Sequence, residues 1–268
     1  MLDLDSDSAV IVAMDHGLNW GVQPGFEDPE ATLSAVLDGD PDGVLAGVPL
    51  LRRFEALLDD HPGVDRVATL DLFHESTLPG VREDAEIHRR VFSPQAAVDA
   101  GADAAKVALV YGRHAEATLE TNLVETAEAA ESCRERGLPL VVEPTLWGER
   151  IDDELDPTYI RNATRVAFEL GADVLKCHYP GDPEAFGRIT GDAPVPVYIA
   201  GGPAADTDLA ALRMVADAVG AGARGVMIGR NIWQRDDPAG MIDAVGAVVH
   251  EGVGPEAAAD LLDTTRDR

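Results

Sequence analysis

Residues 170–179 read LGADVLKCHY, and they join the end of one predicted helix to a short apolar strand. Gly171 marks the end of the predicted helix. The strand that follows, at 173–179, is apolar along most of its length, which is typical of a parallel strand buried on both faces. Two similar turns, AGAD (100–103) and AGAR (221–224), also precede apolar strands. The same step from helix to strand therefore recurs along the chain.

Eight short apolar runs, rich in β-branched residues, span the sequence, and helical patterns separate most of them. The runs are AVIVAMD (9–15), GVLAGV (43–48), RVATLDL (66–72), AAKVALVY (104–111), PLVVEPT (139–145), DVLKCHY (173–179), PVYIAGG (196–202) and GVMIGR (225–230). This alternation predicts an α/β fold, a single (β/α)8 or TIM barrel domain over residues 1–268. The alternative is an open doubly wound sheet, but MDHGLNWG (14–21) lacks the glycine-rich dinucleotide fingerprint expected after its first strand.

Helix boundaries are marked by local signals. Four Asp-Pro or Ser-Pro pairs each predict an N-cap followed by proline at the first helical position: Asp28-Pro29, Ser93-Pro94, Asp156-Pro157 and Asp237-Pro238. Glycines predict the corresponding helix ends at Gly39, Gly101, Gly137 and Gly171.

The charge balance is strongly acidic, with 49 Asp and Glu against 21 Lys and Arg, for a formal net charge of −28. Nucleic acids and anionic membranes need basic surfaces, so neither is expected as a partner. Because the acids are spread along the chain, mostly on predicted helices, we interpret them as an adaptation to high salt. An ordinary acidic protein is the alternative interpretation.

The chain has no apolar run long enough to cross a bilayer, and MLDLDSDSAV (1–10) does not resemble a signal peptide. Its two cysteines, Cys133 and Cys177, form neither a disulfide framework nor a metal-ligand spacing. We therefore expect a cytoplasmic protein with no cofactor. We also expect it to assemble as a homo-oligomer.

The two lysines of the chain stand out, because the other 19 of the 21 basic residues are arginines. Both Lys106 and Lys176 interrupt strands that are otherwise apolar. A buried ammonium is costly, so burial leaves a fraction of the amine of Lys176 neutral and nucleophilic, as Schiff-base formation with a ketone or aldehyde requires. The structural alternative is a lysine that pairs with a buried carboxylate or extends to the barrel rim.

Active sites of such barrels lie at the carboxyl ends of the strands, where this chain places further charged residues. Lys106 is predicted either to favour the neutral amine of Lys176 as a neighbouring cation, or to bind a substrate anion or pair with an acid. Glu143 is a candidate for moving protons to and from a substrate hydroxyl, and Asp15 is a candidate for the same role or for positioning the carbinolamine. Paired carboxylates also suit a divalent metal, but no two histidines have a recognised ligand spacing, so no catalytic metal is predicted.

Glycines end the last two predicted strands, at Gly201-Gly202 and at Gly229, which Arg230 follows. The loops after strands seven and eight form the usual phosphate site of these barrels, and a guanidinium suits phosphate. We therefore expect a phosphorylated small-molecule substrate. The alternative is that these glycines serve only tight turns.

Several segments together resemble the archaeal-type class I aldolases: MDHG (14–17), GADAAKVALVY (101–111), DVLKCHYPGD (173–182), AGGP (200–203) and GRNIWQ (229–234). That group includes fructose-bisphosphate aldolases, aminodideoxyheptulosonate synthases and the tagatose-bisphosphate aldolase branch. The resemblance spans nearly the whole barrel. It implies that Lys176 is the Schiff-base lysine, Asp15 a catalytic carboxylate, and Gly202 and Arg230 phosphate ligands.

One departure from the family pattern is informative. The fructose-bisphosphate and aminodideoxyheptulosonate enzymes carry a proton-shuttling Tyr after the fifth strand, whereas this chain reads VEPTLW (142–147) there. The tagatose-bisphosphate branch resembles this chain in having a Glu on strand five and a Lys on strand four. The resemblance thus favours Glu143 as the proton shuttle and Lys106 as its helper.

The leading hypothesis is a class I aldolase that cleaves or forms a carbon–carbon bond in a phosphorylated ketose, fructose- or tagatose-bisphosphate-like. A transaldolase-type or lysine-dependent acyl transferase on the same scaffold is the rival among enzymes. A sugar-phosphate-binding regulator without catalysis is the rival from another class.

Overall fold

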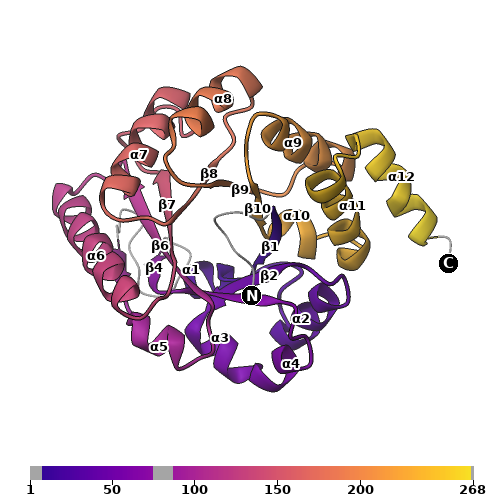
Figure 1. Ribbon diagram of the computed structural model, residues 1–268, viewed down its shortest axis with the longest axis horizontal. Coiled ribbons are helices and arrows are strands. Elements are labelled where there is room, and N and C mark those ends of the chain that lie inside the picture. The colour runs from indigo at the N-terminus through magenta and orange to yellow at the C-terminus, as the bar shows by residue number, and fades with distance from the viewer. Residues whose placement is uncertain (1–7, 75–86, 267–268) are drawn as a thin grey trace.

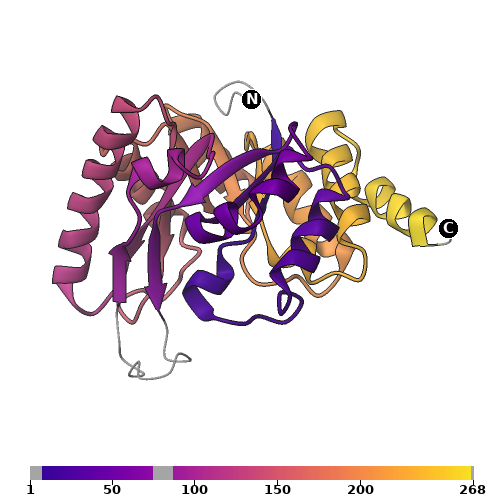
Figure 2. The same ribbon diagram turned by 90° about the horizontal axis from the view of Figure 1, so that it is seen from below.

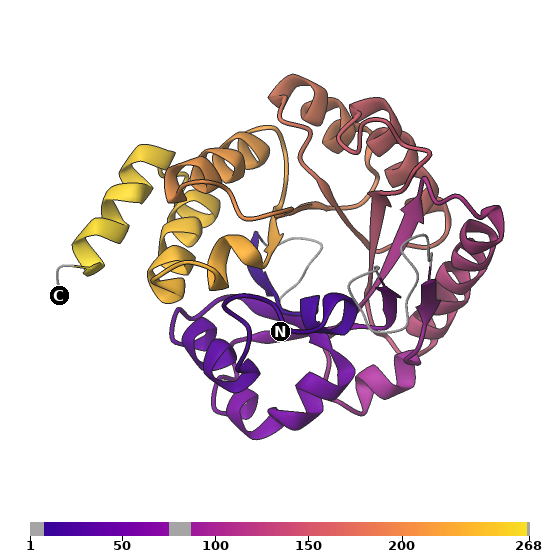
Figure 3. The same ribbon diagram turned by 180° about the vertical axis from the view of Figure 1, so that it is seen from behind.

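A computed structural model describes residues 8–74 and 87–266 of the chain. Eight parallel strands close into a barrel in the order β1-β10-β9-β8-β7-β6-β3-β2, which confirms the predicted (β/α)8 fold. Figure 1 views this ring with its helices outside, and Figure 3 shows it from behind. The barrel strands are β1 Ala9–Ala13, β2 Gly43–Gly47, β3 Asp65–Thr69, β6 Ala104–Tyr111, β7 Leu140–Leu146, β8 Val174–His178, β9 Val197–Ala200 and β10 Gly225–Ile228.

Helices follow the strands and cover the outside of the barrel (Figure 1). Their bounds are α1 His16–Trp20, α2 Pro29–Leu37, α3 Val48–Arg53, α4 Glu55–Asp59, α5 Pro94–Val98, α6 Glu116–Glu135, α7 Pro157–Glu169, α8 Pro183–Asp192, α9 Asp208–Gly220, α10 Arg230–Trp233, α11 Pro238–Glu251 and α12 Pro255–Arg266. Near the C-terminus, α12 packs against α9 and α11 and extends outward from the ring. In the described part of the chain, no helix has the length and apolarity needed to span a membrane.

The predicted N-caps are confirmed. Asp28, Ser93, Asp156 and Asp237 each accept hydrogen bonds from backbone N–H groups of the first helical turn, with proline next in sequence. Asp182-Pro183, which the sequence analysis did not single out, caps α8 in the same way. These caps fix where each helix begins, and hence the length of the loop that connects it to the preceding strand.

One predicted strand, 66–72, is divided in the structure. The barrel strand β3 ends at Thr69, and residues 71–74 form β4, which pairs with β5 (Ile87–Arg90) as an antiparallel hairpin. The chain turns at Leu70, whose carbonyl accepts the N–H groups of both Val91 and Phe92 at 2.9 Å. Figure 2 shows this hairpin extending from one side of the barrel. The periodicity of a continuous apolar run could not reveal that the strand leaves the barrel.

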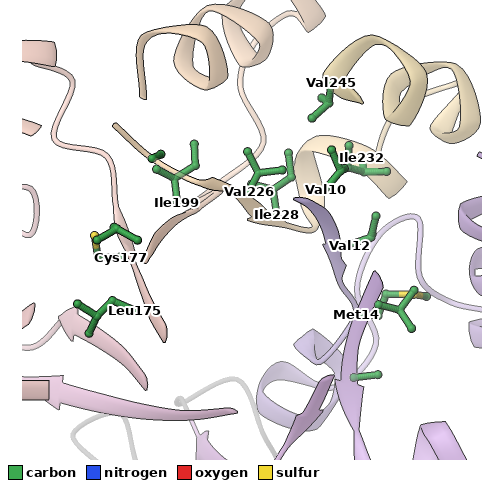
Figure 4. Close-up of a cluster of buried hydrophobic side chains, with 14 of the residues drawn as sticks. Val10, Val12, Met14, Leu175, Cys177, Ile199, Val226, Ile228, Ile232 and Val245 are labelled. Carbon is green, nitrogen blue, oxygen red and sulfur yellow. The ribbon is translucent and has the colours of Figure 1, made fainter. Parts of the chain in front are cut away.

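Side chains alternate between the two faces of each strand. On β8, Leu175 and Cys177 point outward into the core between barrel and helices, which Figure 4 shows in close-up. Val174, on the opposite face, belongs to the buried cluster inside the barrel. Since Lys176 is two residues further along the same face, it also points inward, above this apolar floor.

Candidate active site

A cavity of about 450 Å³ opens at the carboxyl ends of the barrel strands. It contains all eight residues that the sequence analysis selected. They are Asp15, Lys106, Glu143, Lys176, Gly201, Gly202, Gly229 and Arg230. The structure thus brings together side chains from β6, β7 and β8 with the loops after β1, β9 and β10.

Lys176 lies at the centre of this group. It is only 5% exposed, and its Nζ is 2.9 Å from Oε1 of Glu143. Glu143 occupies the corresponding inward position on β7, because Val141 pairs with Val174 and each charged residue lies two positions further along. The register of two neighbouring strands therefore places the amine against the carboxylate.

Lys106 contacts the other oxygen of the same carboxylate. Its Nζ is 2.9 Å from Oε2 of Glu143, and it is 1% exposed. Lys106 pairs in register with Val141, so it lies one inward layer deeper than Glu143. Burial alone would raise the pKa of Glu143, but the charges of Lys106 and Lys176 outweigh burial and hold this pKa well below its ordinary value.

Asp15 is the fourth member of the charged cluster and contacts Lys106. Its Oδ2 lies 3.5 Å from the Nζ of Lys106 and accepts a hydrogen bond of 2.8 Å from the hydroxyl of Thr69. Burial opposes ionisation of Asp15, but Lys106 and Lys176 hold its pKa below the ordinary value. Burial likewise opposes the charge of Lys106, yet Glu143 and Asp15 raise the pKa of Lys106 above the ordinary value. Both carboxylates and the Lys106 ammonium are therefore charged at neutral pH.

Thr69 also belongs to the site, although it was not predicted from the sequence. It is fully buried, and its hydroxyl orients the carboxylate of Asp15. No pattern in the sequence marks this role, because it depends on the register that pairs Thr69 with Lys106. Asp71, in contrast, is not among the residues that line the cavity. Its Oδ2 accepts the N–H of Ala108 at 2.7 Å and contacts Nε2 of His88 at 2.8 Å, so it anchors the hairpin to the barrel.

Glycines shape the opposite wall. A Cβ on Gly201 would lie 2.9 Å from Cβ of Ile228, and one on Gly229 would lie 2.3 Å from the carbonyl oxygen of Ala13. Gly202 has a φ of +61°, a left-handed conformation that glycine adopts without strain. The glycines therefore do serve tight backbone packing, and this packing also exposes main chain to the cavity.

Asn231 fixes the loop after β9, and the sequence analysis did not select it. This buried side chain donates to the carbonyls of Gly201 and Pro203, at 2.9 Å and 3.2 Å, and accepts the N–H of Ala205 at 2.8 Å. Because Asn231 follows Arg230 in sequence, the two glycine-containing loops are held in one geometry.

Three aromatic side chains form part of the cavity wall. Trp20, Phe73 and Trp147 contact one another edge to face, with ring centres 5.1 to 6.4 Å apart. All three line the cavity, whereas Trp233 is buried and donates from its indole nitrogen to the carbonyl of Ala13.

Two histidines also line the cavity, His16 and His178. Burial lowers the pKa of His16 to about 4 and also lowers that of His178, so both are neutral at neutral pH. Cys177 faces the outer core, and burial raises the pKa of its thiol to about 12, as suits a packing residue. Within residues 8–74 and 87–266, no three His, Cys, Asp or Glu side chains are grouped as a metal site would require.

Comparison with known proteins places this geometry in a family. The model of the DeoC/LacD family of aldolases matches residues 9–235. A 2-amino-3,7-dideoxy-D-threo-hept-6-ulosonate synthase of Halobacterium salinarum is 34% identical, over 94% of this chain and 90% of that protein. A class 1 fructose-bisphosphate aldolase of the same species is 32% identical, over 90% of each chain.

Solved structures agree with this placement. An archaeal fructose-1,6-bisphosphate aldolase, determined with its catalytic lysine covalently bound to the carbinolamine intermediate, superposes with a TM-score of 0.80. It is 28% identical, and the match covers 92% of this chain and 96% of that one. The chain therefore belongs to the DeoC/LacD family of aldolases, and it is a lyase of the class I, Schiff-base-forming kind.

Proposed function

We propose that this aldolase cleaves or forms a carbon–carbon bond in a phosphorylated ketose, with Lys176 as the Schiff-base lysine. The observation that carries the proposal is the contact between Lys176 Nζ and Glu143 Oε1, at 2.9 Å, inside the cavity. A buried amine beside a carboxylate has both the nucleophile and the proton acceptor that carbonyl addition requires.

Schiff-base formation begins when Lys176 transfers a proton to Glu143 and its Nζ attacks the ketone carbon. The ketone oxygen becomes the hydroxyl of a carbinolamine. Glu143 returns the proton to this hydroxyl, which leaves as water, and a protonated iminium remains on Lys176. Lys106 keeps its contact with Oε2 of Glu143 throughout, so Oε1 stays directed at the reacting atoms.

Bond cleavage uses the same carboxylate as a base. Glu143 accepts the proton of the hydroxyl on C4 while the C3–C4 electron pair moves toward the iminium nitrogen. An aldehyde leaves and an enamine remains. The enamine carbon then takes a proton, and water hydrolyses the resulting iminium to release the second product. Asp15 is proposed to stabilise the cationic iminium, and its contacts with Thr69 and Lys106, which orient its carboxylate, support this role.

The phosphate of the ketose is proposed to bind at Gly201, Gly202, Gly229 and Arg230. Backbone N–H groups of glycine loops and a guanidinium are the usual ligands of phosphate in such barrels. The three hydrogen bonds of Asn231 to the 201–205 loop support this role, because they preorganise the loop before a ligand arrives.

Substituting the lysine tests the proposal. Lys176→Arg keeps the cation beside Glu143 but cannot form a Schiff base, so aldehyde release from a ketose phosphate should fall to background. Lys176→Arg should still be stabilised by a bound sugar phosphate in a thermal-shift assay, since its phosphate loops are intact. Aldehyde release at a rate near that of the unchanged protein would refute Lys176 as the nucleophile.

A transfer reaction on the same scaffold is the second candidate, favoured by the 34% identity to the heptulosonate synthase named above. Its enamine would add to a second aldehyde instead of being protonated. Product analysis with and without an added aldehyde separates the two reactions. A new carbon skeleton formed faster than the simple cleavage products would assign the chain to transfer.

A further inference from the structure

We propose that His178 is the catalytic base that moves the proton at C3 of the substrate, the carbon that carries the enamine double bond. This inference rests on the proposed function, in which Glu143 serves the nitrogen and the C4 hydroxyl and the donor of the proton at C3 is unassigned. It depends on where His178 lies relative to Lys176 and on what its imidazole contacts.

His178 lies next to the nucleophile on the same face of β8. Val174, Lys176 and His178 alternate with residues that point outward, so all three point into the barrel. At about 3.3 Å per residue, the Cα atoms of Lys176 and His178 are roughly 6.6 Å apart. Because His178 is nearer the carboxyl end of the strand, it lies on the open side of Lys176.

The layer of His178 is the layer that a bound ligand occupies. Lys106 and the apolar cluster inside the barrel fill the space below the amine. An iminium on Lys176 therefore extends its carbons toward the open end of the cavity, and C3 is only two bonds from Nζ. On the neighbouring strands, Thr145 of β7 and Ala200 of β9 also line the cavity, and Ala200 pairs in register with His178. Neither of them can accept a proton from carbon, whereas an imidazole can.

The imidazole of His178 is available to a ligand. It is half-buried, and in the part of the chain that the structure describes no hydrogen bond or ion pair involves it. His16, the other histidine of the cavity, packs its ring against Trp20 and Trp233, with ring centres 5.5 and 5.1 Å apart. The Nδ1 of His16 is buried and lies 3.8 Å from Oδ1 of Asp15. His16 thus belongs to the aromatic part of the cavity wall, and His178 is the histidine that a substrate carbon can approach.

Basicity also favours His178 over the two carboxylates. Although burial acts the other way, the two lysines hold the pKa values of Glu143 and Asp15 below their ordinary values. A carboxylate held in this way is a weak base toward a carbon acid. Burial lowers the pKa of His178 despite the charge of Glu143, which keeps the imidazole neutral and able to accept a proton at neutral pH.

The proposed step begins with the iminium on Lys176. A ring nitrogen of neutral His178 accepts a proton from C3, the C3–H electron pair forms the C2=C3 double bond, and the π pair of the C=N bond moves onto Nζ. A cationic iminium and a neutral imidazole thus become a neutral enamine and an imidazolium. In the cleavage direction the imidazolium returns a proton to C3. It takes that proton from solvent, while Glu143 releases the proton of the C4 hydroxyl to solvent, so the protons balance.

The test separates proton exchange at C3 from Schiff-base formation. Dihydroxyacetone phosphate, the ketone half of a ketose 1-phosphate, is incubated with the protein in deuterium oxide, and the loss of the C3 proton signal is followed by NMR. Borohydride reduction of the same sample measures the covalent adduct by intact mass. In His178→Gln the exchange rate should fall about 100-fold or more, the usual contribution of a general base, while the amount of adduct stays within about twofold.

His114→Gln is the matched control, because His114 is exposed after β6 and does not line the cavity, so this variant should keep both exchange and adduct. Exchange in His178→Gln at the rate of the unchanged protein would overturn the inference. Loss of the adduct in His178→Gln, with an unchanged melting temperature, would also overturn it, because His178 would then act before the enamine forms. If the unchanged protein itself forms no adduct, the Schiff-base proposal fails and the inference falls with it.

Chemical rescue provides a second measurement that does not depend on one variant. In His178→Ala the space that the side chain leaves admits free imidazole, which should restore exchange in proportion to its concentration. Lys176→Arg should show no exchange with or without imidazole, because it cannot form the iminium. Imidazole that leaves exchange in His178→Ala unchanged, while the adduct still forms, would contradict the role of His178 as the base at C3.

Discussion

Lys106 and Glu143 form a buried ion pair, with Nζ 2.9 Å from Oε2, directly behind the lysine that we propose as the nucleophile. The other oxygen of Glu143 contacts Lys176 at the same distance. The only two lysines of the chain thus converge on one carboxylate. Since the carboxylate is shared, a change at Lys106 should reach the reaction through Glu143.

Replacing Lys106 by methionine should move the acid limb of the pH profile. Lys106 lowers the pKa of both Glu143 and Asp15, so its loss raises these pKa values. A carboxylate base works only above its pKa, and activity should therefore be lost at a higher pH as the solution is acidified. Because Glu143 also loses the contact that keeps its Oε1 directed at the reacting atoms, we expect kcat near pH 7 to fall about 10- to 1000-fold, on the order of 1.4 to 4 kcal/mol.

The control for this change is Lys106→Arg, which keeps the charge but crowds the barrel interior and should restore only part of the activity. A rise in KM alone, with an unchanged pH profile, would show that Lys106 binds a substrate anion instead. If the activity of Lys106→Met recovers only at alkaline pH, this would support the alternative expectation that the charge of Lys106 favours the neutral amine of Lys176.

Replacing Asn231 by alanine should weaken substrate binding more than it slows chemistry. The change removes three hydrogen bonds to the 201–205 loop, so the proposed phosphate site loses its preorganisation. We expect KM for a ketose phosphate to rise about tenfold, and stability to fall by about 1–3 kcal/mol from the buried groups left unpaired. Asn162→Ala, on the exposed face of α7, is the control and should change neither quantity. A fall in kcat with constant KM would contradict the phosphate-loop role.

Replacing Gly229 by alanine should destabilise the fold. Its Cβ would lie 2.3 Å from the carbonyl oxygen of Ala13 and 2.6 Å from Cε1 of His16, so β10 would have to move away from β1. Overpacking of this kind costs about 1–3 kcal/mol or more, which a denaturant melt measures directly. Gly246→Ala within α11 should instead stabilise by about 0.5–1 kcal/mol, because nothing lies within 3.8 Å of the added methyl group. Equal free energies of unfolding for Gly229→Ala and Gly246→Ala would refute the packing argument.

We propose that the net charge of −28 reflects adaptation to high salt. Below roughly 1 M salt the Debye length exceeds about 3 Å, so repulsion among the acidic side chains acts over a longer range. The melting temperature should therefore fall as salt is diluted, and an uncharged osmolyte should not replace the salt fully. A melting temperature that stays constant from 2 M down to 0.1 M salt would remove this interpretation and leave the catalytic one intact.

The barrel could be predicted because its signals are local. Eight buried strands read as apolar runs, and capping pairs such as Asp156-Pro157 mark the helix starts. The β4–β5 hairpin could not be predicted in this way. It depends on Asp71, which bonds both His88 and the backbone of Ala108, and these partners are far apart in sequence.

The site followed from the barrel rule that strand ends meet at one face, which placed Lys106, Glu143 and Lys176 together. That Lys106 lies one layer deeper in the barrel than Glu143 could not be predicted, because this difference depends on the register between β6 and β7. Thr69 and Asn231 were missed because their roles are contacts to Asp15 and to loop carbonyls, which no spacing in the sequence reveals. The contact between Trp20 and Trp147 likewise joins segments that follow opposite strands, β1 and β7.

The most direct test of the central claim is borohydride reduction in the presence of dihydroxyacetone phosphate, followed by peptide mass spectrometry. With only two lysines in the chain, the adduct can be assigned without ambiguity to Lys176, Lys106 or the amino terminus. The structure predicts that the peptide containing Lys176 gains the mass of the reduced ligand, while the peptide containing Lys106 stays unmodified. An adduct on Lys106, or no adduct on either lysine, would contradict the assignment of Lys176 as the Schiff-base residue.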